Sequence, residues 1–127
     1  MDKRIINTPN APAPIGPYSQ AVASNGTLYI SGQIPIDPSS GELISSGIQD
    51  ETHQVMKNLK AILEEASVSF NHVVKTSIFV ADMGDFAAIN EVYGSYFGEN
   101  PPARETVEVS TLPKNVNVEI SCIATLR

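Results

Sequence analysis

Two neighbouring stretches decide the fold of this chain, IQDETHQVMKNLKAILEEA at residues 48–66 and VVKTSIFVA at residues 73–81. In the first, apolar residues recur at spacings of three, four and seven, which is the period of an amphipathic helix. In the second, β-branched residues predict a strand, and its apolar side chains fall on both faces. Because one helical layer covers only one face of a sheet, we expect another surface, most simply a second subunit, to cover part of the other face.

Upstream of the helix the chain predicts a hairpin. The dipeptide Asn25-Gly26 is a strong signal for a two-residue turn, and it separates strands expected at residues 20–24 and 27–33. Residues 5–8 are expected to form a short edge strand. Four prolines lie within residues 8–17 and exclude a helix or a central strand there, since proline lacks the N–H donor. We expect that segment to be an ordered, extended surface arm.

A second helix is expected after Asp82 or Asp85, either of which can cap it. Gly98 and the diproline at residues 101–102 should end it. Its apolar stripe would consist of Phe86, Ile89, Tyr93, Tyr96 and Phe97.

The last two strands are expected at residues 104–111 and 116–125, joined as a hairpin that pairs Val109 with Val118. Strand alternation then divides their side chains between the two faces of the sheet. The helix-facing set would be Val107, Val109, Val118, Ile120 and Cys122. The opposite, polar set would be Arg104, Thr106, Glu108, Glu119 and Ser121.

The element order is therefore roughly β-β-β-α-β-α-β-β, which predicts an α+β fold with one sheet and helices on one face. The chain has 127 residues, of which 42% are apolar and 17% charged. Those values are typical of one globular domain with its own core, so we expect residues 1–127 to form a single domain.

The charge and composition exclude several classes of protein. A net charge of −6 with only eight scattered Lys and Arg residues argues against a nucleic-acid surface. No run of about 18 apolar residues predicts a membrane span, and the N-terminus lacks a signal-peptide pattern. The single cysteine, Cys122, fits a buried strand residue. Together these features predict a cytoplasmic protein.

Signatures of metal, phosphate and dinucleotide sites are absent from the sequence, and His53 and His72 are not spaced as a metal pair. We therefore expect no metal and no cofactor. A rigid turn delivers Tyr18 to the start of a strand, either as a packed aromatic or as a phenol over a cleft. In Ser31-Gly32, a glycine inside the strand pattern marks a bulge or a close approach by a ligand or by backbone.

Arg104 follows a diproline at the start of a strand. Most arginines are solvated, yet the planar guanidinium suits a carboxylate, which it can bind through two N–H groups. Glu119, expected nearby on the same face, could be its structural partner, a base, or a group that positions water.

These motifs together resemble the RidA family (reactive intermediate deaminase A, also called the YjgF or YER057c family). The resemblance covers essentially the whole chain. It rests on APIGPYSQ at 13–20, SGQIP at 31–35, NEVY at 90–93, PAR at 102–104, and VEV at 107–109 with LPK at 112–114.

The resemblance implies a chorismate-mutase-like α+β fold, with one mixed β-sheet and two helices packed on one face, and a homotrimer with ligand clefts between subunits. It also implies the activity of a 2-iminobutanoate/2-iminopropanoate deaminase. This hydrolase converts 2-imino acids and their enamine tautomers, such as 2-aminoacrylate and 2-iminobutanoate, to 2-keto acids and ammonia, and so protects pyridoxal-phosphate enzymes.

By motif, the resemblance assigns Arg104 to the substrate carboxylate and Glu119 to the attacking water. It assigns Tyr18, Ser31, Gly32 and Asn90 to the pocket. The family archetype has a cysteine where this chain has Thr106 in the pocket. If that position contributes its backbone carbonyl, threonine can substitute. If the thiol matters, activity or substrate range should shift.

Two alternatives stay open at this point. A non-catalytic keto-acid-binding or regulatory trimer would use the same arginine to hold its ligand. Endoribonuclease activity, which some family members have, is disfavoured by the net charge of −6 and by the lack of a basic stretch.

Overall fold

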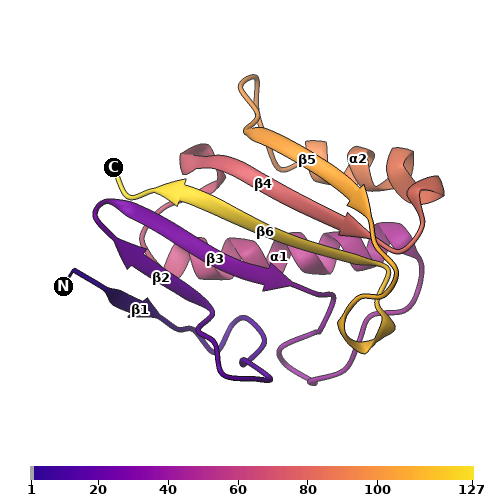
Figure 1. Cartoon of the computed structure of the whole chain (residues 1–127), viewed down its shortest axis with the longest axis horizontal. Coiled ribbons are helices and arrows are strands. Elements are labelled where there is room, and N and C mark those ends of the chain that lie inside the picture. Colours follow the sequence, from indigo (N-terminus) through magenta and orange to yellow (C-terminus); the bar gives the residue numbers. More distant parts are fainter. Residues whose placement is uncertain (1) are drawn as a thin grey trace.

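The computed structural model describes residues 2–127 and shows a six-stranded sheet with two α-helices packed behind it (Figure 1). The strand order is β1-β2-β3-β6-β4-β5, with β4 and β5 parallel and the other described pairs antiparallel. The strands are β1 (Arg4–Ile6), β2 (Ala21–Ser24), β3 (Thr27–Gln33), β4 (Val73–Val80), β5 (Ala103–Glu108) and β6 (Val118–Thr125). The helices are α1 (Ile48–Glu65) and α2 (Phe86–Gly94), with short 3-10 turns η1 (Phe70–His72), η2 (Met83–Asp85) and η3 (Pro113–Asn115).

The helix expected at residues 48–66 is confirmed as α1, and its apolar stripe makes the core. Val55, Met56 and Leu59 are at most 1% exposed, because the stripe faces the sheet along the whole helix. From the sheet, Leu28 and Ile120 meet it and are also fully buried. The expected α+β class with both helices on one face is therefore confirmed.

The hairpin around Asn25-Gly26 is also confirmed. Both turn residues have positive φ, 51° and 80°, as a two-residue turn with the twist of the flanking strands requires. The expected edge strand is present as β1, which pairs with β2 at one side of the sheet.

A buried amide holds the proline-rich arm onto the sheet. The side chain of Gln20 is 2% exposed, and its Oε1 accepts the Thr8 N–H at 2.7 Å. Its Nε2 lies within hydrogen-bond distance of the carbonyls of Thr8, Ala11 and Pro12, at 3.0, 3.3 and 2.9 Å. This clamp fixes the arm that carries Tyr18.

Replacing the clamp, Gln20→Leu, should lower the free energy of unfolding by about 1–3 kcal/mol. Leucine fills similar space but leaves buried backbone groups without partners, which costs that much. Urea denaturation followed by circular dichroism measures the effect. Gln49→Leu, at an exposed position of α1, is the matched control and should be nearly neutral. An unchanged denaturation midpoint in Gln20→Leu would show that the arm is not held by this residue.

The hairpin expected between the last two strands is wrong. β5 pairs in parallel with β4 at the sheet edge, and β6 runs between β3 and β4, where Val118 lies opposite Val80 rather than Val109. The segment that connects β5 to β6 explains why the two strands do not form a tight hairpin. It contains η3, with Lys114 and Asn115 both at positive φ, and carries the chain past β4 into the sheet interior.

The burial pattern of the two strands gives the energetic reason. One face of β6 is fully apolar and at most 4% exposed, which suits a central strand. Strand β5 is mostly exposed, which suits an edge. The buried residues of β6 are Val118, Ile120, Cys122 and Ala124.

This register changes which side chains of β5 and β6 lie on the same face of the sheet. Arg104 lies beside the buried Thr76 and Thr106 beside the buried Ile78, so the alternate residues of β5 (Arg104, Thr106 and Glu108) point toward the helix layer. Val107, expected in the core, points the other way and is 40% exposed. The expectation that Arg104, Thr106 and Glu108 share a polar face with Glu119 and Ser121 is therefore wrong.

The second helix is shorter than expected and ends at Gly94 rather than Gly98. Gly94 and the following Ser95 are poor helix formers, and the Ser95 hydroxyl instead donates to the Val92 carbonyl at 2.6 Å. Of the two expected capping residues, Asp82 caps η2, where it accepts the Gly84 N–H at 2.8 Å. Asp85 stands at the N-cap of α2 but makes no capping hydrogen bond.

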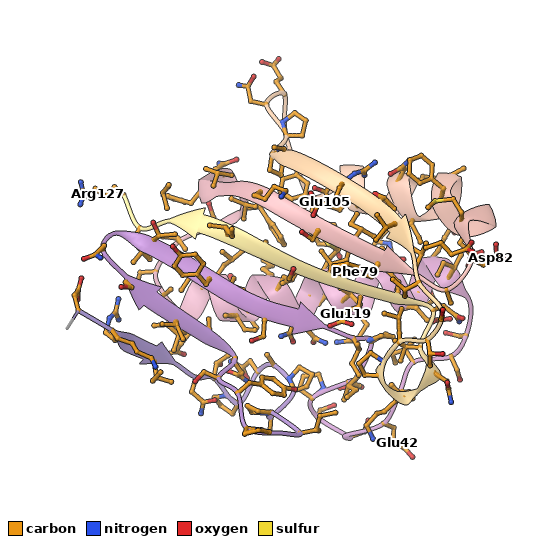
Figure 2. The ribbon with its side chains drawn as sticks, viewed as in Figure 1. Glu42, Phe79, Asp82, Glu105, Glu119 and Arg127 are labelled. Atoms are coloured by element: carbon orange, nitrogen blue, oxygen red, sulfur yellow. The ribbon has the colours of Figure 1, made fainter. Side chains whose placement is uncertain are left out.

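The sheet face turned away from the helices carries Phe79, Glu105 and Glu119 (Figure 2). Exposed apolar side chains on that face include Tyr29 at 51% and Val107 at 40%. None of the helices found in residues 2–127 is long and apolar enough to cross a membrane.

Candidate functional site

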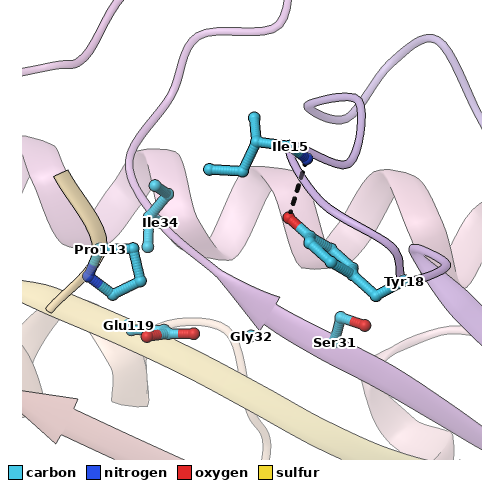
Figure 3. Close-up of a pocket in the computed structure, with 7 residues that line it drawn as sticks. All are labelled: Ile15, Tyr18, Ser31, Gly32, Ile34, Pro113 and Glu119. Carbon is cyan, nitrogen blue, oxygen red and sulfur yellow. Dashed lines mark hydrogen bonds between the residues drawn. The ribbon is translucent and has the colours of Figure 1, made fainter.

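A cavity of about 320 Å³ opens at one end of β3 and β6 (Figure 3). Three parts of the chain build it: the proline-rich arm, strands β3 and β6 with the residue after β3, and the turn η3. Its lining residues are Ile15, Tyr18, Ser31, Gly32, Ile34, Pro113 and Glu119. Four of the residues expected in the site therefore meet here.

The arm places Tyr18 over this cavity. The Tyr18 N–H donates to the Gly16 carbonyl at 2.9 Å, which makes the turn, and the phenol oxygen accepts the Ile15 N–H at 3.2 Å. Since that bond uses a lone pair, the phenol proton remains available to a ligand. The ring is 48% exposed, so it forms a wall of the cavity and not part of the core.

Ser31 presents the opposite hydrogen-bonding character. Its hydroxyl donates to the Ser19 carbonyl at 2.6 Å, so its proton is already used. The oxygen lone pairs can still accept a hydrogen bond from a ligand N–H.

Gly32 and Glu119 are in direct contact at the floor of the cavity (Figure 3). A Cβ on residue 32 would clash with Oε2 of Glu119 and lie 2.8 Å from its carboxyl carbon. The β3 register also shifts between Ile30 and Gln33. The register shift agrees with the expected bulge. The close approach to Gly32 is made by the side chain of Glu119, not by a ligand or by backbone as expected.

Glu119 is half-buried, and this burial raises the pKa of its carboxyl group. A carboxylate whose pKa is moved toward neutrality is a better proton acceptor at working pH. The cavity therefore combines a carboxyl group of raised pKa with a phenol donor and a hydroxyl acceptor.

The contact between the two residues predicts a selective effect for Gly32→Ala. The new methyl group must displace the Glu119 carboxyl. For a reaction in which Glu119 is the general base, we expect the rate to fall by about 10²-fold, the low end of such a group's contribution. Stability should change little, since a flexible side chain absorbs the clash. Steady-state kinetics with parallel thermal melts measure both. Gly98→Ala, at an open position, is the control, and wild-type turnover in Gly32→Ala would contradict the arrangement.

A second cluster surrounds Arg104 on the helix side of the sheet. Its Nη1 donates to Oδ1 of Asn90 at 2.7 Å, and its guanidinium carbon lies 5.5 Å from the Phe86 ring centre and 5.1 Å from that of Tyr93. Residues 86, 90 and 93 are spaced by four and three, so they share one face of α2. That face forms a cradle for the arginine, with hydrogen bonding and cation–π contact.

Thr106 adds an unsatisfied polar atom to this cluster. It is two residues from Arg104 on the same face of β5, and its buried hydroxyl has no hydrogen-bond partner within residues 2–127. Buried polar atoms without partners are uncommon in folded proteins. A ligand held by Arg104 could supply the missing partner.

The site residues expected from sequence thus fall into two groups within one chain. Tyr18, Ser31, Gly32 and Glu119 line the cavity, whereas Asn90, Arg104 and Thr106 lie on the helix side near the edge strand. Arg104 does not pair with Glu119 as suggested, because the two residues lie on opposite faces of the sheet; Arg104 donates to Asn90.

Five residues of these clusters were not among the site residues expected from the sequence: Ile15, Ile34, Pro113, Phe86 and Tyr93. Phe86 and Tyr93 were assigned only to the apolar stripe of α2. Their spacing from Asn90 was the available signal, because it puts all three on one helix face.

Fold and site together define a class: a one-sided α+β sheet protein with an arginine suited to small carboxylates and a half-buried acid beside a cavity. The model of the endoribonuclease L-PSP family matches residues 8–126. The chain therefore belongs to this family, which includes the RidA/YjgF proteins.

Two relatives illustrate the range of names in the family. A RutC family protein of Pyrococcus horikoshii is 57% identical over 122 residues, 96% of this chain and 97% of that protein. The mouse 2-iminobutanoate/2-iminopropanoate deaminase is 50% identical over 122 residues, 96% of this chain and 90% of that protein.

Two solved structures have the same fold. A protein of the conserved Rid family from Yersinia pestis is 49% identical with a TM-score of 0.95, covering 97% of this chain and 98% of that one. Escherichia coli TdcF with bound serine is 41% identical with a TM-score of 0.92, covering 96% and 98%.

Proposed function

We propose that this protein is a 2-iminobutanoate/2-iminopropanoate deaminase, a hydrolase that converts 2-imino acids and their enamine tautomers to 2-keto acids and ammonia and so protects pyridoxal-phosphate enzymes. The observation that carries the proposal is Arg104. Its guanidinium is half-buried, yet within residues 2–127 it forms no ion pair. A substrate carboxylate would supply the missing charge and could accept two N–H bonds. The deaminase relatives and the serine-bound TdcF structure support a ligand of this chemistry.

The reaction needs few groups. A protonated imine is electrophilic, so water adds to its carbon while the Glu119 carboxylate accepts a proton from that water. The Glu119 carboxyl then returns that proton to the nitrogen of the carbinolamine. The C–N bond breaks to release ammonia, and the hydroxyl loses its proton as it becomes the keto oxygen. The Ser31 oxygen can accept the imine N–H, and the Tyr18 phenol can donate to the developing hydroxyl. Arg104 holds the carboxylate at the other end of the substrate, so the reacting atoms meet in a fixed geometry.

The two clusters must come from neighbouring copies in this proposal. Arg104 and Glu119 lie on opposite faces of the sheet and two strands apart, a lateral separation of about 10 Å. An imino acid of three or four carbons does not span that distance around a sheet. A homotrimer, with Arg104 of one copy facing the cavity of the next, would bring the groups together and cover exposed side chains such as Tyr29 and Val107. Light scattering on the purified protein tests the trimer.

A coupled assay tests the activity. A dehydratase acting on serine or threonine generates 2-aminoacrylate or 2-iminobutanoate in situ, and keto-acid release is compared with and without this protein. Acceleration supports the deaminase. Keto-acid binding without acceleration would show a ligand-binding or regulatory protein instead.

A further inference from the structure

Behind Arg104 lies a buried pair of hydroxyl groups. Thr76 Oγ1 and the Tyr93 phenol oxygen are 2.7 Å apart, and the two residues are 1% and 5% exposed. Thr76 is also the register partner of Arg104 across the parallel β4–β5 pair. The pair therefore joins the strand next to Arg104 to the helix that cradles it.

This hydrogen bond is not explained by stability alone. A buried pair of hydroxyls contributes little more than two apolar groups of the same shape, and it is costly if one partner is lost. Valine and phenylalanine at these positions would fill the same core. What the pair adds is direction. A phenol makes its hydrogen bonds preferentially in the plane of its ring, so a bond to Thr76 favours one ring plane, which the packing of Tyr93 against Phe97 also restricts.

That ring plane matters because it supports the guanidinium. The centre of the Tyr93 ring lies 5.1 Å from the Arg104 guanidinium carbon. The same ring also packs against Phe97, with 4.8 Å between the two ring centres. Phe86, the second ring near Arg104, is 39% exposed and therefore less constrained. Of the two aromatic rings in the cradle, Tyr93 is therefore the more rigid. Burial also raises the pKa of its phenol, so it stays neutral and does not compete with a ligand carboxylate for Arg104.

We propose that Thr76 and Tyr93 are positioning residues that fix the plane of the Arg104 guanidinium, and thereby set its affinity for the ligand carboxylate. This inference rests on the proposed function, since it takes a small 2-keto or 2-imino acid as the ligand of Arg104. The pair touches no reacting atom and acts through the arginine.

The test measures the binding of 2-ketobutyrate and of its uncharged methyl ester by calorimetry, together with turnover and melting temperature. Thr76→Val and Tyr93→Phe should each weaken 2-ketobutyrate binding about three- to tenfold, the worth of one net hydrogen bond. Ester binding should stay within about twofold, whereas kcat/KM for the imino acid should fall at least as much as the keto-acid affinity. The double variant should lose no more than either single one, because both changes remove the same bond.

Two further variants separate positioning from folding. Thr52→Val removes another buried hydroxyl, one that donates to the Ile48 carbonyl at 2.7 Å in α1. It should lower the melting temperature without changing keto-acid affinity. Thr76→Ser keeps a hydroxyl group and should bind 2-ketobutyrate as the wild type does.

Unchanged keto-acid affinity in both Thr76→Val and Tyr93→Phe would overturn the proposal, as would an equal loss for acid and ester. Absence of keto-acid binding by the wild type would overturn it together with the proposed function. A third outcome is a protein that binds keto acids through this pair but does not hydrolyse imines. It would support the positioning role and reject only the deaminase activity.

Discussion

Arg104→Ala should abolish imine hydrolysis while leaving the protein folded. Removing the charged partner of a desolvated carboxylate costs about 2–5 kcal/mol, which corresponds to roughly 30-fold to several thousand-fold in kcat/KM. The protein should stay folded, because within residues 2–127 the guanidinium has no ion pair. The variant loses one hydrogen bond to Asn90 and the cation–π contacts with Phe86 and Tyr93. The measurement is hydrolysis of freshly generated 2-aminoacrylate, with a parallel thermal melt.

Two comparisons make the Arg104 result specific. Arg4→Ala changes the net charge equally at an exposed position of β1 and should leave activity intact. Arg104→Lys keeps the charge but loses the planar fork, so it should retain only part of the activity. Near-normal turnover by Arg104→Ala would refute the assignment of the carboxylate anchor.

Glu119→Gln should bind 2-keto acids but turn over slowly. Loss of a general base lowers kcat by about 10²–10⁴-fold, whereas the amide keeps the size and hydrogen-bonding reach of the side chain. Glu64→Gln, an exposed carboxylate on α1, is the control and should be silent. Rates equal to the wild type in Glu119→Gln would remove this residue from the mechanism.

The pH dependence gives an independent check on Glu119. Burial raises its pKa, so the wild-type rate should begin to fall with decreasing pH above the range usual for a glutamate. The same raised pKa affects stability in the opposite direction, because lowering the pH makes the folded protein more stable. A raised folded pKa means that ionisation opposes folding, and that penalty disappears as pH falls through the folded pKa. Glu119→Gln should therefore be at least as stable as the wild type at neutral pH.

The two variants can also be mixed. If the site combines Arg104 of one copy with Glu119 of the next, mixed oligomers of Arg104→Ala and Glu119→Gln contain some sites with both native residues. Activity should then return after the two inactive proteins are unfolded and refolded together. A mixture that stays inactive, although subunits have exchanged, would place both residues in the same chain's site and contradict the proposed assembly.

Most secondary structure was predictable because its causes are local. The stripe of α1 needs only a period of 3.6, and the turn at Asn25-Gly26 needs only residues that tolerate positive φ. The end of α2 was placed four residues late because Tyr96 and Phe97 continue the apolar pattern after the helix has stopped. Periodicity reports burial, and burial continues beyond a helix end when the following loop packs on the core.

The prediction of which strands pair was wrong. Sequence neighbours often pair, so β5 and β6 were expected to form a hairpin, yet β6 inserts between β3 and β4. Pairing depends on the apolar content of every strand that competes for the central position, and no local pattern contains that comparison. The error placed Arg104 and Glu119 on one face when they lie on two.

The helices and strands, the one-sided layering and the residue types of the site could be predicted from the sequence, because those depend on periodicity, turn chemistry and local motifs. The side of the sheet that each residue occupies depends on how the strands pack together. A strand's alternation fixes which residues share a face, but not which face is buried. That choice came from packing, and it separates the Arg104 cradle from the Glu119 cavity within each chain.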